Sequence, residues 1–176
     1  MKPNCVFNIM NNEAGARIYA EMIEWLGRVY EVHEVWHDGS RFEYDGLKRL
    51  QDVCAETGCA CLYIHTRGAV NVWKTTEATR RMWAEEFGVQ WRKYFLIAEN
   101  PLPTVVCPFV DYDRETRYNG FVANAAAMAA VSIKLTTDRM DYERLWRDAP
   151  DVRMVGTLIQ DRGIKDIRKY LYANYG

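Results

Sequence analysis

The stretch "CLYIHTRG", residues 61–68, decides how the fold of this chain is interpreted. It opens with four apolar or aromatic residues that favour a strand, and these lead directly into His65, Thr66 and Arg67, followed by Gly68. A short apolar run that is bounded by turn residues predicts a buried strand over residues 60–64. An imidazole, a hydroxyl and a guanidinium would then be delivered to one edge of a sheet.

The sequence before this stretch alternates between strand and helix patterns. Apolar spacing predicts a strand over residues 5–9 closed by Asn11 and Asn12, a helix over 13–27, a strand over 29–36, and a helix that stops near Gly58. Strands that alternate with helices in this order form parallel sheets. The first half of the chain therefore predicts a parallel sheet flanked by helices.

The second half is less regular. It predicts a long helix over residues 75–100 that is interrupted at Gly88, and a strand over 105–110 in which Pro108 requires an edge position or a bulge. Further helices are expected over residues 123–135, 141–147 and 164–175. We expect a single α/β domain, residues 1–176, with a mostly parallel sheet whose ligands bind beyond the carboxyl ends of the strands.

Composition limits the class of protein. With 176 residues, 49% hydrophobic and 13% aromatic, the chain suffices for one packed core. The formal net charge of −1 gives no overall attraction to nucleic acid or an anionic membrane, so an anionic ligand needs a local site. The start lacks a secretory signal pattern, and the longest uncharged stretch, residues 118–133, contains two asparagines. We expect a soluble, cytoplasmic protein with no membrane span.

The five cysteines form an odd set, which predicts a reducing compartment rather than a disulfide framework. Cys59 and Cys61 are two residues apart and would face the same way on a strand. No cluster of histidines and cysteines follows them, so core packing is favoured over metal binding.

The turn at residues 65–68 has the chemistry of an anion site. Arg67 offers a planar fork of donors that suits phosphate, Gly68 lets backbone amides approach, and His65 can donate, accept or titrate near neutrality. The alternative is structural: His65 would satisfy a buried carbonyl, and Arg67 would pair with a surface acid.

A second candidate site is "VDYDRETR", residues 110–117. Asp111 and Asp113 can share a divalent cation, Mg²⁺ or Mn²⁺, and such a cation can neutralise a diphosphate. The alternative is that the neighbouring Arg114 and Arg117 pair with these acids.

Other polar residues carry weaker signals. Asn11 and Asn12 could hold a nucleobase or a sugar hydroxyl, although asparagine is also an ordinary turn residue. His33 and His37 lie four residues apart around a strand end, and a surface or loop role is favoured for them over metal binding. The phosphate-binding, nucleophile-elbow and dinucleotide-binding glycine motifs are missing from the sequence.

The stretch "FEYDGLKRLQDVCAETGCACLYIHTRG", residues 42–68, resembles a family of small glycosyltransferases from bacterial polysaccharide loci and viral genomes. That family carries an L-Y-I-H-T-K-G signature after an E-x-x-T-L-x-x-L-x-x-x-C helix. Glu43, Leu47, Leu50 and Cys54 match the helix pattern, and Arg67 replaces the lysine.

The resemblance is weaker outside this stretch. "VFNIMNN" is similar to the family's opening strand, and "TRRMWAEEF" and "YNGFVANAAAMAAV" resemble two later segments. Residues 119–122 depart from the family's S-G-N-F-W-W-A segment, and residues 156–159 lack the acid of its E-x-W-I segment.

The resemblance implies a GT-A, Rossmann-like sandwich that transfers a sugar from a nucleotide diphosphate donor to a hydroxyl. In that interpretation Asn11 and Asn12 line the nucleoside end, while Thr66, Arg67 and Gly68 form the turn that binds the diphosphate. His65 orients a substrate, and Asp111 and Asp113 hold the cation. The acceptor, whether polysaccharide, protein or a modified nucleic-acid base, and the general base, whether Asp111, Asp113 or Glu115, stay open.

Two other classes of function remain. One is a nucleotide- or sugar-phosphate-binding interaction module that has lost turnover, which the altered later segments favour. The other is a structural domain that uses the polar turns to bind a protein partner.

Overall fold

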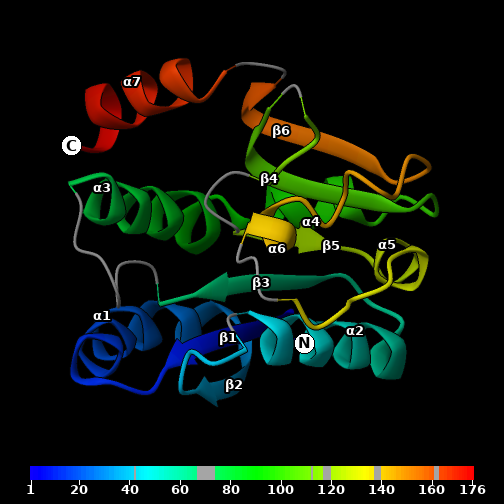
Figure 1. Cartoon of the computed structure of the whole chain (residues 1–176), viewed down its shortest axis with the longest axis horizontal. Helices are drawn as coiled ribbons and strands as arrows, with labels where there is room; N and C mark the ends of the chain where they lie inside the picture. The colour runs from blue at the N-terminus through cyan, green and yellow to red at the C-terminus, as the bar shows by residue number, and fades with distance from the viewer. Residues whose placement is uncertain (42, 67–73, 112, 117–119, 137–139, 161–162) are drawn as a thin grey trace.

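The computed structural model of the chain describes residues 1–41, 43–66, 74–111, 113–116, 120–136, 140–160 and 163–176 (Figure 1). Within these residues one sheet of six strands has the order β2-β1-β3-β5-β4-β6. The strands are β1 (Asn4–Met10), β2 (Glu31–His37), β3 (Cys61–His65), β4 (Thr104–Val110), β5 (Phe121–Ala123) and β6 (Arg153–Gln160). The helices are α1 (Glu13–Val29), α2 (Tyr44–Thr57), α3 (Lys74–Trp83), the π-helical η1 (Ala84–Val89), α4 (Trp91–Ala98), α5 (Ala125–Ala130), α6 (Met140–Glu143) and α7 (Ile164–Tyr175).

The two faces of the sheet bury separate apolar clusters. On one face Phe7 and Ile9 of β1 belong to a cluster with α1, α3, η1, α4 and α7. On the other face Val6 and Tyr63 belong to a cluster with α2, α5 and α6. Because successive side chains of a strand point to opposite faces, β1 contributes to both clusters, and the fold is a helix–sheet–helix sandwich.

The order of elements predicted for the first half of the chain is confirmed. Asn12 caps α1, and Gly58 ends α2 in the left-handed conformation, with a φ of 67°. Strands β2 and β3 both run parallel to β1 and lie on either side of it. The apolar periodicity was therefore sufficient to predict these elements.

The prediction of a mostly parallel sheet is wrong, because the sheet is mixed. Strand β5 runs antiparallel to both of its neighbours, β3 and β4. This strand ends at Ala123, the first residue of the segment predicted as a helix over residues 123–135, and α5 covers only six residues of that segment. The alanines after β5 do form the helix α5, whereas the residues of β5 itself are buried between two strands and pair with both.

Gly88 lies in η1, so the predicted long helix is interrupted there by a π-helical segment before α4.

Pro108 lies in a central strand rather than at an edge, since β4 pairs with β5 and β6. The alternative prediction of a bulge is confirmed. Between two paired positions, Cys107 with Gly156 and Phe109 with Ile159, β4 advances by two residues while β6 advances by three.

Four cysteines are buried core residues, and all five thiols are free. Cys59 is the exception: it is exposed and precedes β3, so it does not share a strand face with the buried Cys61 as the spacing had predicted. No helix in the described parts of the chain has the length and apolar character needed to cross a membrane.

The winding of the chain reverses at β1. From β1 the chain passes through α1 to β2 on one side, and then through α2 to β3 on the other side. The two helices belong to clusters on opposite faces of the sheet. In open α/β sheets this reversal, at the carboxyl ends of the two diverging strands, is where ligands bind. Here those ends are Met10 and His65.

The first turn of α1 lies directly against the end of β1, and Gly15 makes this approach possible. A β-carbon on Gly15 would lie 1.9 Å from the carbonyl oxygen of Met10, whereas one on Gly27 in the same helix would meet nothing within 4 Å.

We expect Gly15→Ala to destabilise the protein by about 3 kcal/mol, because backbone atoms must move apart. Gly27→Ala should stabilise it by about 0.5–1 kcal/mol. Urea unfolding of both variants measures this, and equal effects would contradict the proposed packing.

Candidate functional site at the carboxyl ends of the strands

Thr66, which follows β3, makes hydrogen bonds to β1 at the point where both strands end. Its backbone N–H donates to the carbonyl of Asn8 at 3.0 Å, and its hydroxyl oxygen accepts the N–H of Met10 at 2.9 Å. The residue is buried, with 5% of its surface exposed. Thr66 therefore holds the end of β3 against the end of β1.

The start of α1 lies at the same edge. The N–H of Asn11 donates to the carbonyl of His37 at 2.7 Å, and the Asn12 side chain accepts the N–H of Gly15 at 2.7 Å. Both asparagines are exposed. A 17-residue helix that starts here brings the positive end of its dipole to the edge, which favours a negatively charged ligand.

His65 closes β3 and is half-buried. Its ring lies 5.6 Å from the ring of Trp83, measured between centroids, in an edge-on arrangement. Arg67 and Gly68, the predicted diphosphate ligands, lie outside the described residues. The structure thus places His65 and Thr66 beside Asn11 and Asn12 at the edge where the winding reverses.

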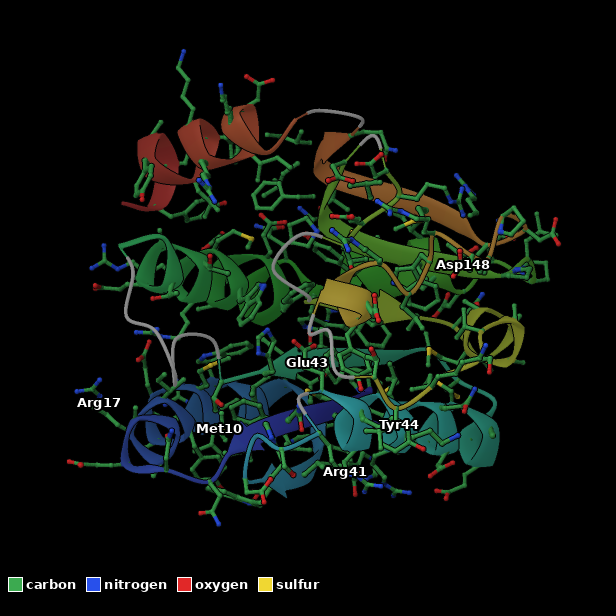
Figure 2. The ribbon with its side chains drawn as sticks, in the orientation of Figure 1. Met10, Arg17, Arg41, Glu43, Tyr44 and Asp148 are labelled. Atoms are coloured by element: carbon green, nitrogen blue, oxygen red, sulfur yellow. The ribbon has the colours of Figure 1, made fainter. Side chains whose placement is uncertain are left out.

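Three buried polar side chains, those of Tyr63, Glu43 and Asn8, lie close to this edge on the α2 side of the sheet; Figure 2 labels Glu43. The Tyr63 hydroxyl donates to Oε2 of Glu43, the residue before α2, at 3.3 Å. Burial, together with the Glu43 charge, raises the pKa of Tyr63 well above its usual value.

Asn8 belongs to the same buried group. Its amide lies close enough to Tyr63 to oppose part of the rise in pKa, yet neither of its polar atoms has a partner with normal hydrogen-bond geometry among the described residues. Gly46 of α2 packs against this side chain, since a β-carbon there would lie within 3 Å of three Asn8 atoms. Sequence analysis gave none of these residues a role at the site, because only the pairing of β1 with β3 brings them together.

Asp111 follows β4 at the same edge of the sheet. Leu62 of β3 and Val106 of β4 both pair with Val122 of β5, so counting along the strands brings Val110 level with Thr66. Two strand spacings, about 10 Å, separate them. Asp111 is 3% exposed, and its Oδ1 accepts the N–H groups of Asp113 and Glu115 at 3.0 and 3.1 Å. Its carboxylate therefore shapes the turn.

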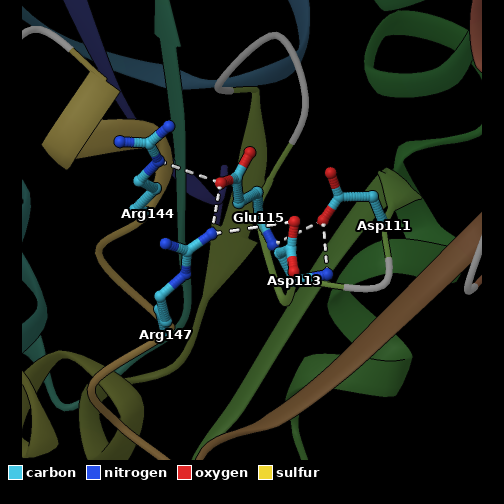
Figure 3. Close-up of polar contacts among 5 residues, drawn as sticks. All are labelled: Asp111, Asp113, Glu115, Arg144 and Arg147. Atoms are coloured by element: carbon cyan, nitrogen blue, oxygen red, sulfur yellow. Dashed lines mark hydrogen bonds and ion pairs between the residues drawn. The ribbon is translucent and has the colours of Figure 1, made fainter. Parts of the chain in front are cut away.

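Glu115 is held by two arginines that are distant in the sequence (Figure 3). Its Oε1 accepts from Nε of Arg144 at 3.0 Å and from Nη2 of Arg147 at 2.9 Å, and the side chain is 2% exposed. Arg147 also lies 3.8 Å from the carboxylate of Asp113, which is 65% exposed. Of the three acids, Asp113 is thus the most accessible to a substrate.

Arg114 does not pair with the neighbouring acids in the way the alternative interpretation had expected. Its guanidinium donates to the carbonyls of Trp146, Ala149 and Val152, at 3.4, 2.9 and 2.6 Å. Its φ of 60° lies in the left-handed region, which is unusual for arginine. These bonds connect the turn after β4 to the segment that leads into β6.

The protein groups alone do not form a closed cation site. No set of three or more His, Cys, Asp or Glu side chains in the described part of the chain could hold a metal ion. Asp111 accepts two backbone N–H groups, and Asp113 lies beside a guanidinium. A divalent cation would therefore need most of its ligands from the diphosphate and solvent.

The two histidines of β2 do not form a joint site, since residues four apart on a strand are about 13 Å apart. Nε2 of His33 lies 3.1 Å from Oδ1 of Asn4, and Nδ1 of His33 lies 3.4 Å from Nη2 of Arg49. His37 accepts the N–H of Gly39 on Nδ1 at 3.1 Å. Burial lowers the pKa of His37, although Asp45 and Asp38 partly oppose this.

Comparison of the chain with family models, with curated proteins and with solved structures gives no match. The site must therefore be interpreted from its own geometry.

The Glu115 cluster gives a prediction for stability. Glu115→Gln should destabilise the protein by about 2 kcal/mol, less than for a fully buried pair, because the two arginines are partly exposed and can be rehydrated. Asp113→Asn, in the same turn, should change stability by less than about 0.5 kcal/mol. Denaturant unfolding measures both. Similar losses for the two variants would show that Glu115 is not the anchor.

The lowered pKa of His37 predicts a pH dependence. The unfolded chain binds a proton at this group near pH 6.5, whereas the folded protein does so only at lower pH, so stability should decrease as the pH falls below about 6.5. Between pH 7.5 and 5.5, His37→Gln should lose less stability than the unmodified protein in thermal unfolding. An unchanged slope would assign the pH dependence to other groups.

Proposed function

We propose that this chain is a glycosyltransferase that moves a sugar from a nucleotide diphosphate donor to a hydroxyl acceptor. One observation carries the proposal. The edge at which the winding reverses also holds His65 and Thr66, at the end of β3, and the first residues of α1. Ligands of open α/β sheets bind at this position, and a helix start favours phosphate there.

The roles follow from position along this edge. Asn11 and Asn12 lie between the ends of β1 and β2 and would contact the nucleoside, although the oxygen of the Asn12 amide is already used to cap α1. Thr66 is too buried to bind the donor directly and would hold the turn in place. Arg67 and the amide of Gly68 would then bind the diphosphate, and His65 would orient the donor or the acceptor.

Transfer forms a bond between the acceptor oxygen and the anomeric carbon, while the bond from that carbon to the diphosphate breaks. Negative charge develops on the leaving diphosphate, where donors such as the Arg67 guanidinium stabilise it most. Mg²⁺ or Mn²⁺ bound to the diphosphate would neutralise this charge, with Asp113 as the more accessible protein ligand. The cytoplasmic location and the GT-A type of sandwich are parts of the same proposal.

An inverting reaction also needs a base for the acceptor hydroxyl. Asp111 accepts two N–H bonds and Glu115 accepts from two arginines, so an oxygen of each carboxylate is already engaged within the protein. Asp113 is exposed and has only a 3.8 Å contact with Arg147. It is therefore our candidate for the base.

A second candidate function is nucleotide binding without turnover. It is favoured by the structural use of Asp111 and Glu115, which leaves one accessible carboxylate on the described part of the turn after β4. Incubation with UDP- and GDP-sugars separates the two. An enzyme releases nucleoside diphosphate slowly even without an acceptor, whereas a binding module is stabilised by the donor and releases nothing.

The proposal predicts that nucleotide diphosphate sugars raise the thermal midpoint, and that the increase grows with Mn²⁺. Arg67→Ala should weaken donor binding by about 10- to 100-fold, because it removes a charge-assisted contact with the diphosphate. Arg28→Ala removes the same charge from an exposed pair with Glu24 and should leave binding unchanged. If no nucleotide sugar shifts the midpoint, or Arg67→Ala leaves the shift intact, the proposal is wrong and a structural role is favoured.

A further inference from the structure

Strand β2, at the edge of the sheet, presents a tryptophan to solvent. Among the tryptophans that the structure describes, Trp36 alone is exposed, with 42% of its surface accessible. Trp25 and Trp91 are half-buried, and Trp83 and Trp146 are buried. Trp36 lies in β2, which pairs on one side only, with β1. A large flat apolar surface is therefore open to a ligand at this edge.

The Trp36 ring is held in one orientation by Tyr19 of α1 and by Glu34 of its own strand. The centroids of the Trp36 and Tyr19 rings are 5.1 Å apart, and Nε1 of Trp36 donates to Oε2 of Glu34 at 3.0 Å. The Tyr19 hydroxyl donates to the other oxygen, Oε1, at 2.7 Å. Tyr19 is stacked in turn on the buried Phe7, with ring centroids 5.9 Å apart. One carboxylate thus fixes two aromatic rings that rest on the core.

We call Tyr19, Glu34 and Trp36 the aromatic platform. Both polar groups of its rings, the indole N–H and the phenol O–H, are already bonded to Glu34. An aromatic side chain whose orientation is fixed in advance loses little conformational entropy when a ligand covers it. The platform is therefore pre-organised for a ligand that presents a flat face.

The chemistry of the platform favours a neutral ligand that carries hydroxyl groups. A carboxylate offers about four acceptor positions, and the two rings use two of those on Glu34, so it can accept further donors from a ligand. The charge in contact with both rings is that of Glu34, and β2 contains no lysine or arginine. The residues three and four positions from Tyr19 along α1 are uncharged as well. An anionic ligand is therefore disfavoured here.

We propose that the aromatic platform binds a sugar ring of a neutral oligosaccharide. A pyranose has a face of C–H groups, which the negative face of an aromatic ring attracts, and hydroxyl donors around its rim. Its apolar face lies on Trp36, and its hydroxyl groups donate to Glu34. The site goes beyond the proposed transfer reaction, because it uses none of the residues assigned to the donor, and a sugar binds here whether or not it is transferred.

The test is a titration of the full chain, labelled with ¹⁵N-tryptophan, with maltohexaose, cellohexaose and mannohexaose. The indole N–H resonance of Trp36, assigned by its loss in Trp36→Phe, should shift saturably with at least one of these three. By calorimetry, Trp36→Ala should weaken that binding at least roughly tenfold. Tyr19→Phe keeps the ring but removes one bond to Glu34, and should weaken it about threefold without unfolding the protein. The anionic hexagalacturonate should bind more weakly than the neutral sugars.

Tyr172→Ala is the matched control, because Tyr172 on α7 is exposed to a similar extent, 47%, but no hydrogen bond holds its hydroxyl within the described residues. It should leave oligosaccharide binding unchanged. The proposal is overturned if none of the three neutral sugars shifts the Trp36 resonance, or if uridine shifts it and the sugars do not. Tightest binding of hexagalacturonate, or an equal loss of binding in Tyr172→Ala and Trp36→Ala, overturns it as well.

Discussion

The pairing of β1 with two parallel strands, one on each side, is the constraint on which the rest of the structure depends. The chain passes from β1 through α1 to β2 on one side, and then from β2 through α2 to β3 on the other side. Because crossover connections between parallel strands are right-handed, α1 and α2 must cover opposite faces of the sheet. Both helices then start at the same edge, one after Asn12 and one after Glu43. The close packing of Gly15 on Met10 and of Gly46 on Asn8 keeps these starts against the sheet.

The sequence predicted the first half of the fold well because its signals are local. Strand and helix periodicity, the Asn12 cap and the Gly58 stop all act within a few residues. The second half depends on distant pairing. Phe121 to Ala123 form a strand only because β3 and β4 lie on either side, and the bulge around Pro108 requires an additional residue from β6. Neither partner is visible in the local pattern.

The candidate site shows the same division. Residues at strand ends, such as His65 and Asp111, could be found from the sequence, since chemistry-bearing residues after apolar runs are easy to recognise. What their side chains bond to could not be predicted. Glu115 meets arginines about thirty residues later, and Arg114 turns away from its acidic neighbours toward three carbonyls. The buried amide of Asn8 could not be recognised from the sequence, because only the pairing of β1 with β3 brings it close to Tyr63.

The winding also gives the two edges of the sheet opposite polarity. Helices that run antiparallel to the strands between them start at the carboxyl edge, which gathers N–H groups, and end at the amino edge, which gathers carbonyls. At the carboxyl edge the chain adds polar turns around His65 and Asn11 that suit an anion. At the amino edge α2 and α4 end without a basic residue in their last turns, and the charges are mixed, since Glu99 lies there with Lys2 and the amine of Met1. One topological choice at β1 therefore gathers helix starts, with the N–H groups that their first turns leave unpaired, at the edge where His65 and Asn11 lie.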